Sequence, residues 1–82
     1  MDIAEIRASV IAVLTKIAPE VDLSVLRHDR PLRSQVDLDS MDWLNVILGV
    51  HERLKVDIPE SDYGRLTSID AIVSYLAERM PR

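Results

Sequence analysis

The sequence predicts an all-α protein, a small four-helix bundle with three long helices, one short helix and a long first loop. Apolar residues recur at steps of three and four in three separate segments, which is the pattern of amphipathic helices. No segment alternates apolar and polar residues as a strand would. Because 82 residues accommodate little more than one core, we expect residues 1–82 to form a single domain.

The first helix is expected at about residues 3–17. Asp2 and Glu5 have the spacing of a capping box at its start. Pro19 then prevents the helix from continuing, because proline and the residue before it both resist helical geometry. The expected apolar stripe consists of Ile3, Ile6, Val10, Val13, Leu14 and Ile17.

Residues 19–39 contain two prolines and no sustained period, which predicts a long loop. Loops longer than about 12–15 residues are usually functional or disordered. The apolar residues of this loop are spread along its length, so we expect the loop to lie across the core. They are Val21, Leu23, Leu26, Leu32, Val36 and Leu38.

A second helix is expected at about residues 40–54, with Asp39 as its cap and Asp42 in its first turn. Its expected apolar face consists of Leu44, Ile47, Leu48 and Leu54. A short helical turn is expected at about residues 60–64, ended by Gly64.

The last helix is expected at about residues 68–80, beginning at Thr67 or Ser68 with Asp70 supporting the cap. Its expected apolar stripe consists of Ile69, Ile72, Val73, Leu76 and Met80.

The composition excludes several classes of protein. Without cysteine the chain has no disulfide framework, no thiolate metal site and no cysteine nucleophile. A formal net charge of −4 argues against nucleic-acid binding, which depends on Lys and Arg. No apolar stretch is long enough for a membrane span, and the first residues do not resemble a signal peptide. We expect a cytoplasmic monomer.

The negative charge is concentrated in residues 37–62, which hold seven acids and only two bases. Such asymmetry indicates a partner with a basic face. It is equally consistent with a solvated acidic surface that only keeps the domain in solution.

Nothing in the sequence indicates catalysis. The two histidines, His28 and His51, have no neighbouring nucleophile or second metal ligand, so we interpret both as structural and expect no metal site. The two glycines are far apart and form no phosphate-binding loop. We therefore expect no catalytic residue and no intrinsic enzymatic activity.

The remaining candidate is Ser40, at the predicted start of a helix and within the most acidic part of the chain. The first turn of a helix exposes unpaired N–H groups and the positive end of the helix dipole, so a phosphodiester attached there would be stabilised. Serine is also an ordinary capping residue, and on this pattern alone Ser40 has no necessary function.

Several segments together resemble an acyl carrier protein over about residues 3–80. They are the run from Leu38 to Asp42 (LDSMD), the aliphatic helix after it, the LKVDIP break at 54–59, the closing TSIDAI segment at 67–72, and Arg30-Pro31-Leu32 in the long first loop. The order of the elements and the length of the chain agree with that family as well.

The resemblance implies that Ser40 carries a 4′-phosphopantetheine arm taken from coenzyme A by a separate, Mg²⁺-dependent phosphopantetheinyl transferase. Asp39 and Met41 match the motif on either side of the serine, and Asp39 would help to engage the transferase and its metal ion. The arm would end in a thiol that holds cargo as a thioester. A chain without cysteine would thereby obtain its one reactive thiol from a cofactor.

Partner docking is expected at Asp42, Trp43 and Glu52, along the helix that follows the serine. Asn45, His51 and Arg53 stand where fatty-acid carriers often have acids, and the usual glycine before Asp-Ser is absent. These departures favour a specialised, freestanding carrier. The side chains of Trp43, Met41 and Leu44 could belong either to the core or to a docking surface, and the sequence does not decide between the two.

The expected partners are the transferase, an acyl- or aminoacyl-loading ligase, and downstream synthase or transferase enzymes of fatty-acid or secondary-metabolite biosynthesis. The cargo is either an acyl or an aminoacyl group. The alternative is an unmodified helical module that binds another protein through its acidic patch and Trp43.

Overall fold

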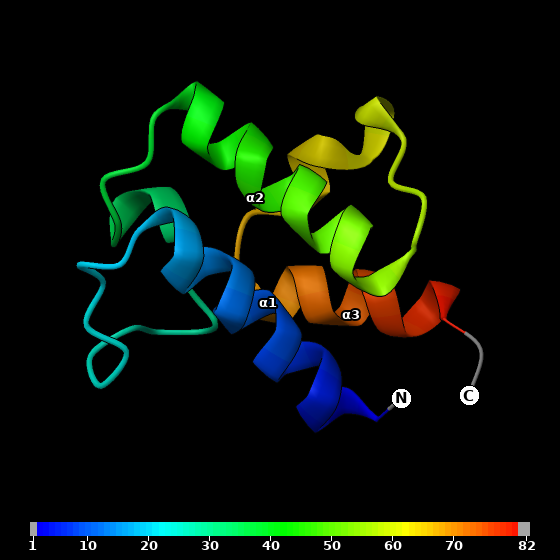
Figure 1. Cartoon of the computed structure of the whole chain (residues 1–82), viewed down its shortest axis with the longest axis horizontal. Helices are drawn as coiled ribbons and strands as arrows, with labels where there is room; N and C mark the ends of the chain where they lie inside the picture. The colour runs from blue at the N-terminus through cyan, green and yellow to red at the C-terminus, as the bar shows by residue number, and fades with distance from the viewer. Residues whose placement is uncertain (1, 81–82) are drawn as a thin grey trace.

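The computed structural model describes residues 2–80 of the chain, and every regular element in that range is helical (Figure 1). The three long helices are α1 (Ile3–Ile17), α2 (Ser40–Leu54) and α3 (Ile69–Arg79). Two short 3₁₀ helices are η1 (Leu32–Ser34) and η2 (Glu60–Arg65). The predicted all-α class and small helical bundle are confirmed. Residues 1, 81 and 82 of the expected domain lie outside the described residues.

Each long helix begins at a polar cap. Asp2, Asp39 and Ser68 each accept a hydrogen bond from the backbone N–H three residues later, at 2.8, 2.8 and 3.0 Å. A cap of this kind contributes about 1 kcal/mol by satisfying an otherwise unpaired donor. Ser68 is therefore the cap of α3, which begins at Ile69, one residue later than the sequence suggested.

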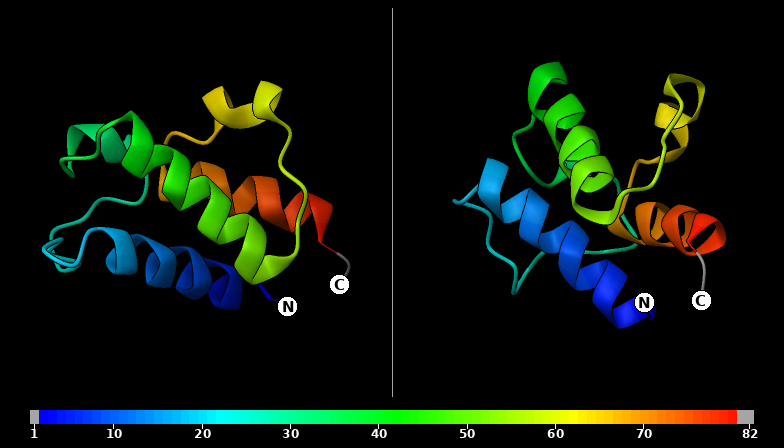
Figure 2. Two further views of the ribbon diagram at one scale, coloured as in Figure 1. Left: turned by 45° about the horizontal axis from the view of Figure 1, so that its top comes forward. Right: turned by 45° about the vertical axis from the view of Figure 1, so that its right-hand side comes forward.

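The core lies where α1 packs against both α2 and α3, while η2 lies on the far side of α2 and α3 from α1 (Figures 1 and 2). The most completely buried side chains come from all three long helices, from η1 and from the segment before α3. They are Ile6, Val10, Leu14, Leu32, Val46, Ile47, Val50, Leu66, Ile69, Ile72 and Leu76.

The buried face of α2 agrees with the expected one at Ile47 and Leu54 and differs from it at Leu44 and Leu48. Leu44 and Leu48 are 40% and 43% exposed, and Val46 and Val50 are buried in their place. Because α2 carries aliphatic residues on most of its circumference, periodicity alone could not select the side that faces the core. Ile3 of α1 is also exposed, since it lies at the end of the helix, beyond the area that α2 and α3 cover.

The first loop covers the core at four of the six apolar positions named from the sequence. Leu26, Leu32, Val36 and Leu38 are buried, whereas Leu23 is exposed. The sixth, Val21, is partly buried and packs against the core.

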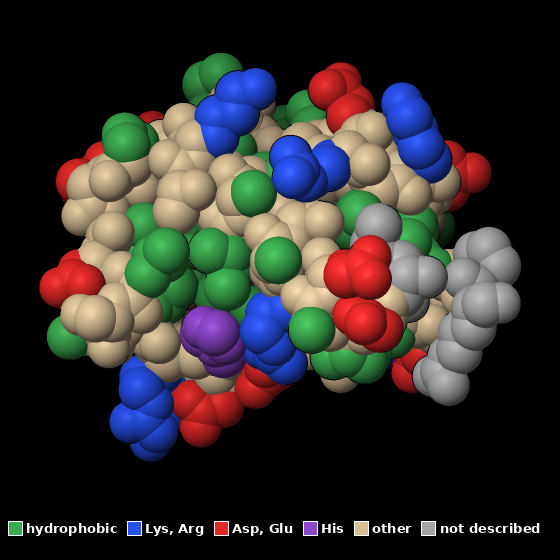
Figure 3. Space-filling view, turned by 60° about the horizontal axis from the view of Figure 1, so that its bottom comes forward, with side chains coloured by type: hydrophobic (Ala, Val, Ile, Leu, Met, Phe, Trp, Pro, Cys, Tyr) green, Lys and Arg blue, Asp and Glu red, His purple; other side chains and the backbone are tan. Residues whose placement is uncertain are grey.

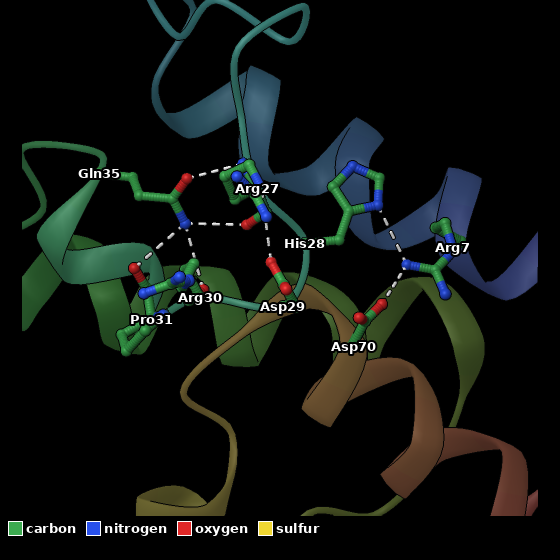
Figure 4. Close-up of polar contacts among 8 residues, drawn as sticks. All are labelled: Arg7, Arg27, His28, Asp29, Arg30, Pro31, Gln35 and Asp70. Carbon is green, nitrogen blue, oxygen red and sulfur yellow. Dashed lines mark hydrogen bonds and ion pairs between the residues drawn. The ribbon is translucent and has the colours of Figure 1, made fainter.

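Two backbone hydrogen bonds tie the first loop to the start of α3. Leu32 N–H donates to the carbonyl of Thr67, and Asp70 N–H donates to the carbonyl of His28, at 2.8 and 3.0 Å. The Arg7 guanidinium lies between the carboxylate of Asp70 and the Nδ1 atom of His28, at 2.5 and 3.1 Å (Figure 4). Arginine can only donate, so His28 accepts through Nδ1. His28 thus has a structural role. Asp70, which the sequence suggested would support the cap of α3, lies in the first turn of that helix and also binds Arg7.

The short helix η2 is attached to α3 by one polar cluster. Tyr75 donates its hydroxyl proton to the carboxylate of Asp62 at 2.6 Å, and Arg79 lies 3.4 Å from the same oxygen. The Arg79 guanidinium also stacks on the Tyr75 ring at 3.7 Å. Burial raises the pKa of Tyr75 above its usual value of 10.0, the hydrogen bond to Asp62 raises this pKa further, and Arg79 partly offsets the rise.

Tyr75 makes the stability of the fold sensitive to alkaline pH. Because the phenol is harder to ionise in the folded chain than in the unfolded chain, its contribution is complete below about pH 10 and is lost as the pH rises through the folded-state pKa. We expect the free energy of unfolding to fall as the pH rises above about 10 in the wild type and to fall less in Tyr75→Phe. Urea titrations at several pH values measure both slopes, and equal slopes would contradict this account.

The helices α1 and α2 lie close together at Gly49. A Cβ atom on Gly49 would lie 2.7 Å from Cγ1 of Val13, closer than two carbon atoms can pack. Val13 is β-branched and sits inside a helix, so its side chain has essentially one rotamer and cannot move aside. Gly64 provides a matched comparison, because no atom lies within 4 Å of the corresponding position.

We expect Gly49→Ala to destabilise the fold and Gly64→Ala to leave its stability unchanged or slightly raised. Overpacking costs roughly 1–3 kcal/mol, and replacing glycine by alanine inside a helix returns about 1 kcal/mol. The net loss at Gly49 is then about 1 kcal/mol. Urea denaturation measures this loss. In a Val13→Ala background, Gly49→Ala should lower the free energy of unfolding less than it does in the wild type, because the shorter side chain removes the clash. A Gly49→Ala variant as stable as Gly64→Ala would show that the two helices are not in this close contact.

Candidate functional site

Ser40 is the first residue of α2, and its side chain is exposed. The segment leading to it alternates between core and surface: Val36 and Leu38 are buried, whereas Asp37 and Asp39 are exposed. A turn closed by a 2.8 Å hydrogen bond from Leu38 N–H to the carbonyl of Val36 shapes this approach. The two buried residues anchor the backbone just before the helix, so the serine is presented from a rigid support.

Asp39 organises the first turn of α2. Its carboxylate accepts from Asp42 N–H at 2.8 Å, and its backbone carbonyl accepts from Trp43 N–H at 2.9 Å. Within residues 2–80, the N–H groups of Ser40 and Met41 have no such partner. Both point along the helix axis toward the end that attracts negative charge. An exposed hydroxyl beside two free amides fits the attachment of a phosphodiester.

An apolar stripe starts beside Ser40 on the outer face of α2. We define the outer stripe as Met41, Leu44 and Leu48, which are 73%, 40% and 43% exposed. Their spacing of three and four residues places them on one side of the helix. The structure therefore assigns Met41 and Leu44, which the sequence left open, to the surface. Leu48 was missed as a surface residue because it had been placed on the core face.

Trp43 and Asp42 are each partly buried. The indole of Trp43 packs against the edge of the core, so this side chain is mainly a packing residue with one accessible side. Asp42 has its backbone in the capped turn, two residues after Ser40. Of the two, the carboxylate of Asp42 offers the stronger means of attracting a basic partner.

Glu52 lies apart from the other expected docking residues. It is ten residues after Asp42, which corresponds to about 15 Å along a helix and about 80° around it. It lines an open groove of about 760 Å³ between α1 and α2. The other charged residues of that groove are basic: Lys16, Arg53 and Lys55. The structure does not bring Asp42 and Glu52 into one acidic patch.

A smaller hollow of about 290 Å³ separates α2 from η2. It is lined mostly by apolar side chains, and His51 lies at its edge. The Nδ1 atom of His51 is 2.7 Å from the carbonyl of Val56. Since a carbonyl only accepts, this nitrogen carries the proton, and the contact holds the chain as it leaves α2.

Two further findings concern classes of site that the sequence analysis considered. Among the described residues, no group of three or more His, Cys, Asp or Glu side chains is arranged to hold a metal ion. None of the helices in residues 2–80 has the length and apolar character needed to cross a membrane.

Comparison with known proteins identifies a family and several relatives of the chain. The family described as phosphopantetheine attachment site matches residues 5–76. The acyl carrier protein of Campylobacter lari is 29% identical over 56 residues, covering 68% of this chain and 73% of its own length. The corresponding protein of Campylobacter jejuni strain 81-176 is 27% identical over the same length.

A plant relative extends the similarity over almost the whole sequence. Acyl carrier protein 2, mitochondrial, of Arabidopsis thaliana is 27% identical over 77 residues, which is 94% of this chain and 60% of that protein. The family match spans most of the chain, including all of α2 and most of α1 and α3. The chain therefore belongs to the phosphopantetheine attachment site family, and it is a carrier protein of the acyl-carrier type with a covalently attached 4′-phosphopantetheine as its cofactor.

Proposed function

We propose that Ser40 is the attachment site and that the protein passes a thioester-bound acyl or aminoacyl group between partner enzymes. The observation that carries the proposal is the placement of an exposed serine hydroxyl on the first turn of a capped helix. A hydroxyl at that position is open to an external enzyme and adjacent to two free backbone amides. The family match supports the cofactor, and the structure supplies a serine that fits it.

The chain's part in the attachment reaction is small. Ser40 Oγ would lose its proton to a base of the transferase and form the new bond to the phosphorus next to the pantetheine of coenzyme A. The phosphoanhydride bond of coenzyme A breaks, and adenosine 3′,5′-bisphosphate leaves. Asp39 holds the first turn of α2 while leaving its carboxylate exposed, within reach of the transferase and its Mg²⁺. The attached group supplies a terminal thiol for thioester chemistry. All catalytic groups would then belong to the partner enzymes.

The surface around Ser40 has features suited to docking. Asp37, Asp39 and Asp42 carry negative charge on both sides of the serine, and the outer stripe adds apolar area directly after it. Charges of this kind accelerate the encounter with a basic partner, whereas apolar contacts contribute most of the affinity. Loading ligases, downstream synthases and the transferase are the partners that the proposal requires.

The alternative function is an unmodified interaction module that binds through its acidic patch and Trp43. The packing of Trp43 against the core reduces the aromatic surface available for such binding. Both functions would use the same acidic surface, so covalent modification is what distinguishes them.

The first test is the mass of the intact protein after incubation with coenzyme A, Mg²⁺ and a promiscuous phosphopantetheinyl transferase. We expect the wild type to gain the mass of one phosphopantetheine group and Ser40→Ala to gain none. Ser34→Ala is the matched control, because Ser34 is also exposed but lies at the end of η1. Wild type and Ser40→Ala with equal, unchanged masses would exclude the carrier function through this serine.

The second test separates the two ends of α2. We expect Asp42→Lys to weaken loading by a basic transferase about tenfold or more, through KM, because it reverses a charge only two residues from Ser40. Glu52→Lys makes the same change of charge about 15 Å farther along the helix, where the surroundings are already basic. We expect Glu52→Lys to weaken loading less than threefold, because Glu52 lies outside the docking face. Circular dichroism checks that both variants remain helical, and equal effects would show that only net charge matters.

A further inference from the structure

The first loop encloses a pocket that is separate from the outer stripe of α2. Its volume is about 240 Å³, and it lies between residues 20–26 and residues 35–37. We call it the first-loop pocket. Its lining consists of Glu20, Val21, Asp22, Val25, Leu26, Gln35, Val36 and Asp37. Of these residues, only Asp37 belongs to the surface around Ser40 described above.

The first-loop pocket combines negative charge with exposed apolar surface. Three of its lining residues, Glu20, Asp22 and Asp37, are acids, and none is basic. Val25 is 70% exposed, which is unusual for an aliphatic side chain, and the adjacent Leu23 is 45% exposed. On the side of the molecule where the first loop lies in Figure 1, Figure 3 shows acidic and hydrophobic side chains among uncharged ones, with Lys or Arg side chains below them.

Hydrogen bonds hold the pocket in shape. The Gln35 side chain accepts from Arg27 N–H at 2.6 Å and donates to the carbonyls of Arg27 and Arg30 at 2.8 and 3.1 Å (Figure 4). Asp22 accepts from both the N–H and the hydroxyl of Ser24. The hydroxyl bond is the larger influence and lowers the pKa of Asp22, so its carboxylate stays charged near neutral pH. A pocket built in advance loses little entropy when a partner enters it.

The position of the pocket specifies which partner would cover it. Asp37 precedes Ser40 by three residues, so their Cα atoms are at most about 11 Å apart. A typical protein interface covers about 800 Å² on each side, which as a disc has a radius of about 16 Å. An enzyme that places its active site over Ser40 therefore extends over Asp37, which is one of the residues that line the first-loop pocket.

We propose that the first-loop pocket is a docking site for the phosphopantetheinyl transferase that modifies Ser40. The pocket takes one apolar side chain of the enzyme, and the three carboxylates pair with Lys or Arg residues beside it. This inference rests on the proposed function, because it presumes that Ser40 is modified. An anionic membrane is a poorer occupant, since the three carboxylates repel it.

The test measures kcat and KM for loading with the transferase, using the whole chain. Val25→Ser removes apolar contact without changing charge, and Ile3→Ser is its control, because Ile3 is also an exposed aliphatic residue but lies at the start of α1. Glu20→Gln with Asp37→Asn removes two charges from the pocket. Glu5→Gln with Glu78→Gln removes two from α1 and α3, so both pairs change the net charge equally.

We expect Val25→Ser and the pocket charge pair each to raise KM at least fivefold with kcat changed less than twofold, while both controls stay within twofold of the wild type. Added salt should reduce the effect of the charge pair and leave that of Val25→Ser in place. Normal loading of Ser40 with unchanged KM in the pocket variants would overturn this inference and leave the proposed function standing. No loading of the wild type would overturn both.

Discussion

The arrangement of the protein depends on one constraint: its three long helices, of 11 to 15 residues, do not cover the core by themselves. The first loop completes that core with Leu26, Leu32, Val36 and Leu38. Burying one such side chain contributes about 1.5–3 kcal/mol, so the loop is held almost as firmly as a helix. Since Val36 and Leu38 immediately precede Asp39, the burial that stabilises the fold also sets the direction from which the chain enters α2.

The electrostatics of α2 follow from its direction. Its N-terminal end carries Asp39 and Asp42, its last turn carries Arg53, and Lys55 caps the helix, which is the order that the helix dipole favours. The same order divides the surface of the carrier into an acidic end at Ser40 and a basic groove at the far end. The order of charges that stabilises a helix therefore also gives α2 one acidic and one basic end, which a partner can distinguish.

Much of the helical framework could be predicted, because caps and prolines are local signals. Asp2, Asp39 and Ser68 mark the starts of the long helices in the sequence as they do in the structure. The buried side of α2 could be predicted only in part, at Ile47 and Leu54, because aliphatic residues occur on most of its sides. The close contact of Gly49 with Val13, which no local pattern indicates, lies on the side that faces α1. The motif at residues 38–42 identified Ser40 as a candidate. The first-loop pocket was missed, since it depends on Gln35 bonding to residues four to eight positions away.

A carrier must combine an accessible attachment point with a surface that enzymes recognise, and these demands conflict with the burial that a short chain needs. This chain separates them by giving the core mainly to α1, α3 and one side of α2, while the other side of α2 and the tip of the first loop stay exposed. Exposed apolar side chains such as Met41 and Val25 lower solubility unless something offsets them. The acids clustered beside them do so by charge repulsion between copies. The acids near these exposed apolar side chains thus contribute to solubility even when no partner is bound. Partner recognition uses a surface that solubility already requires.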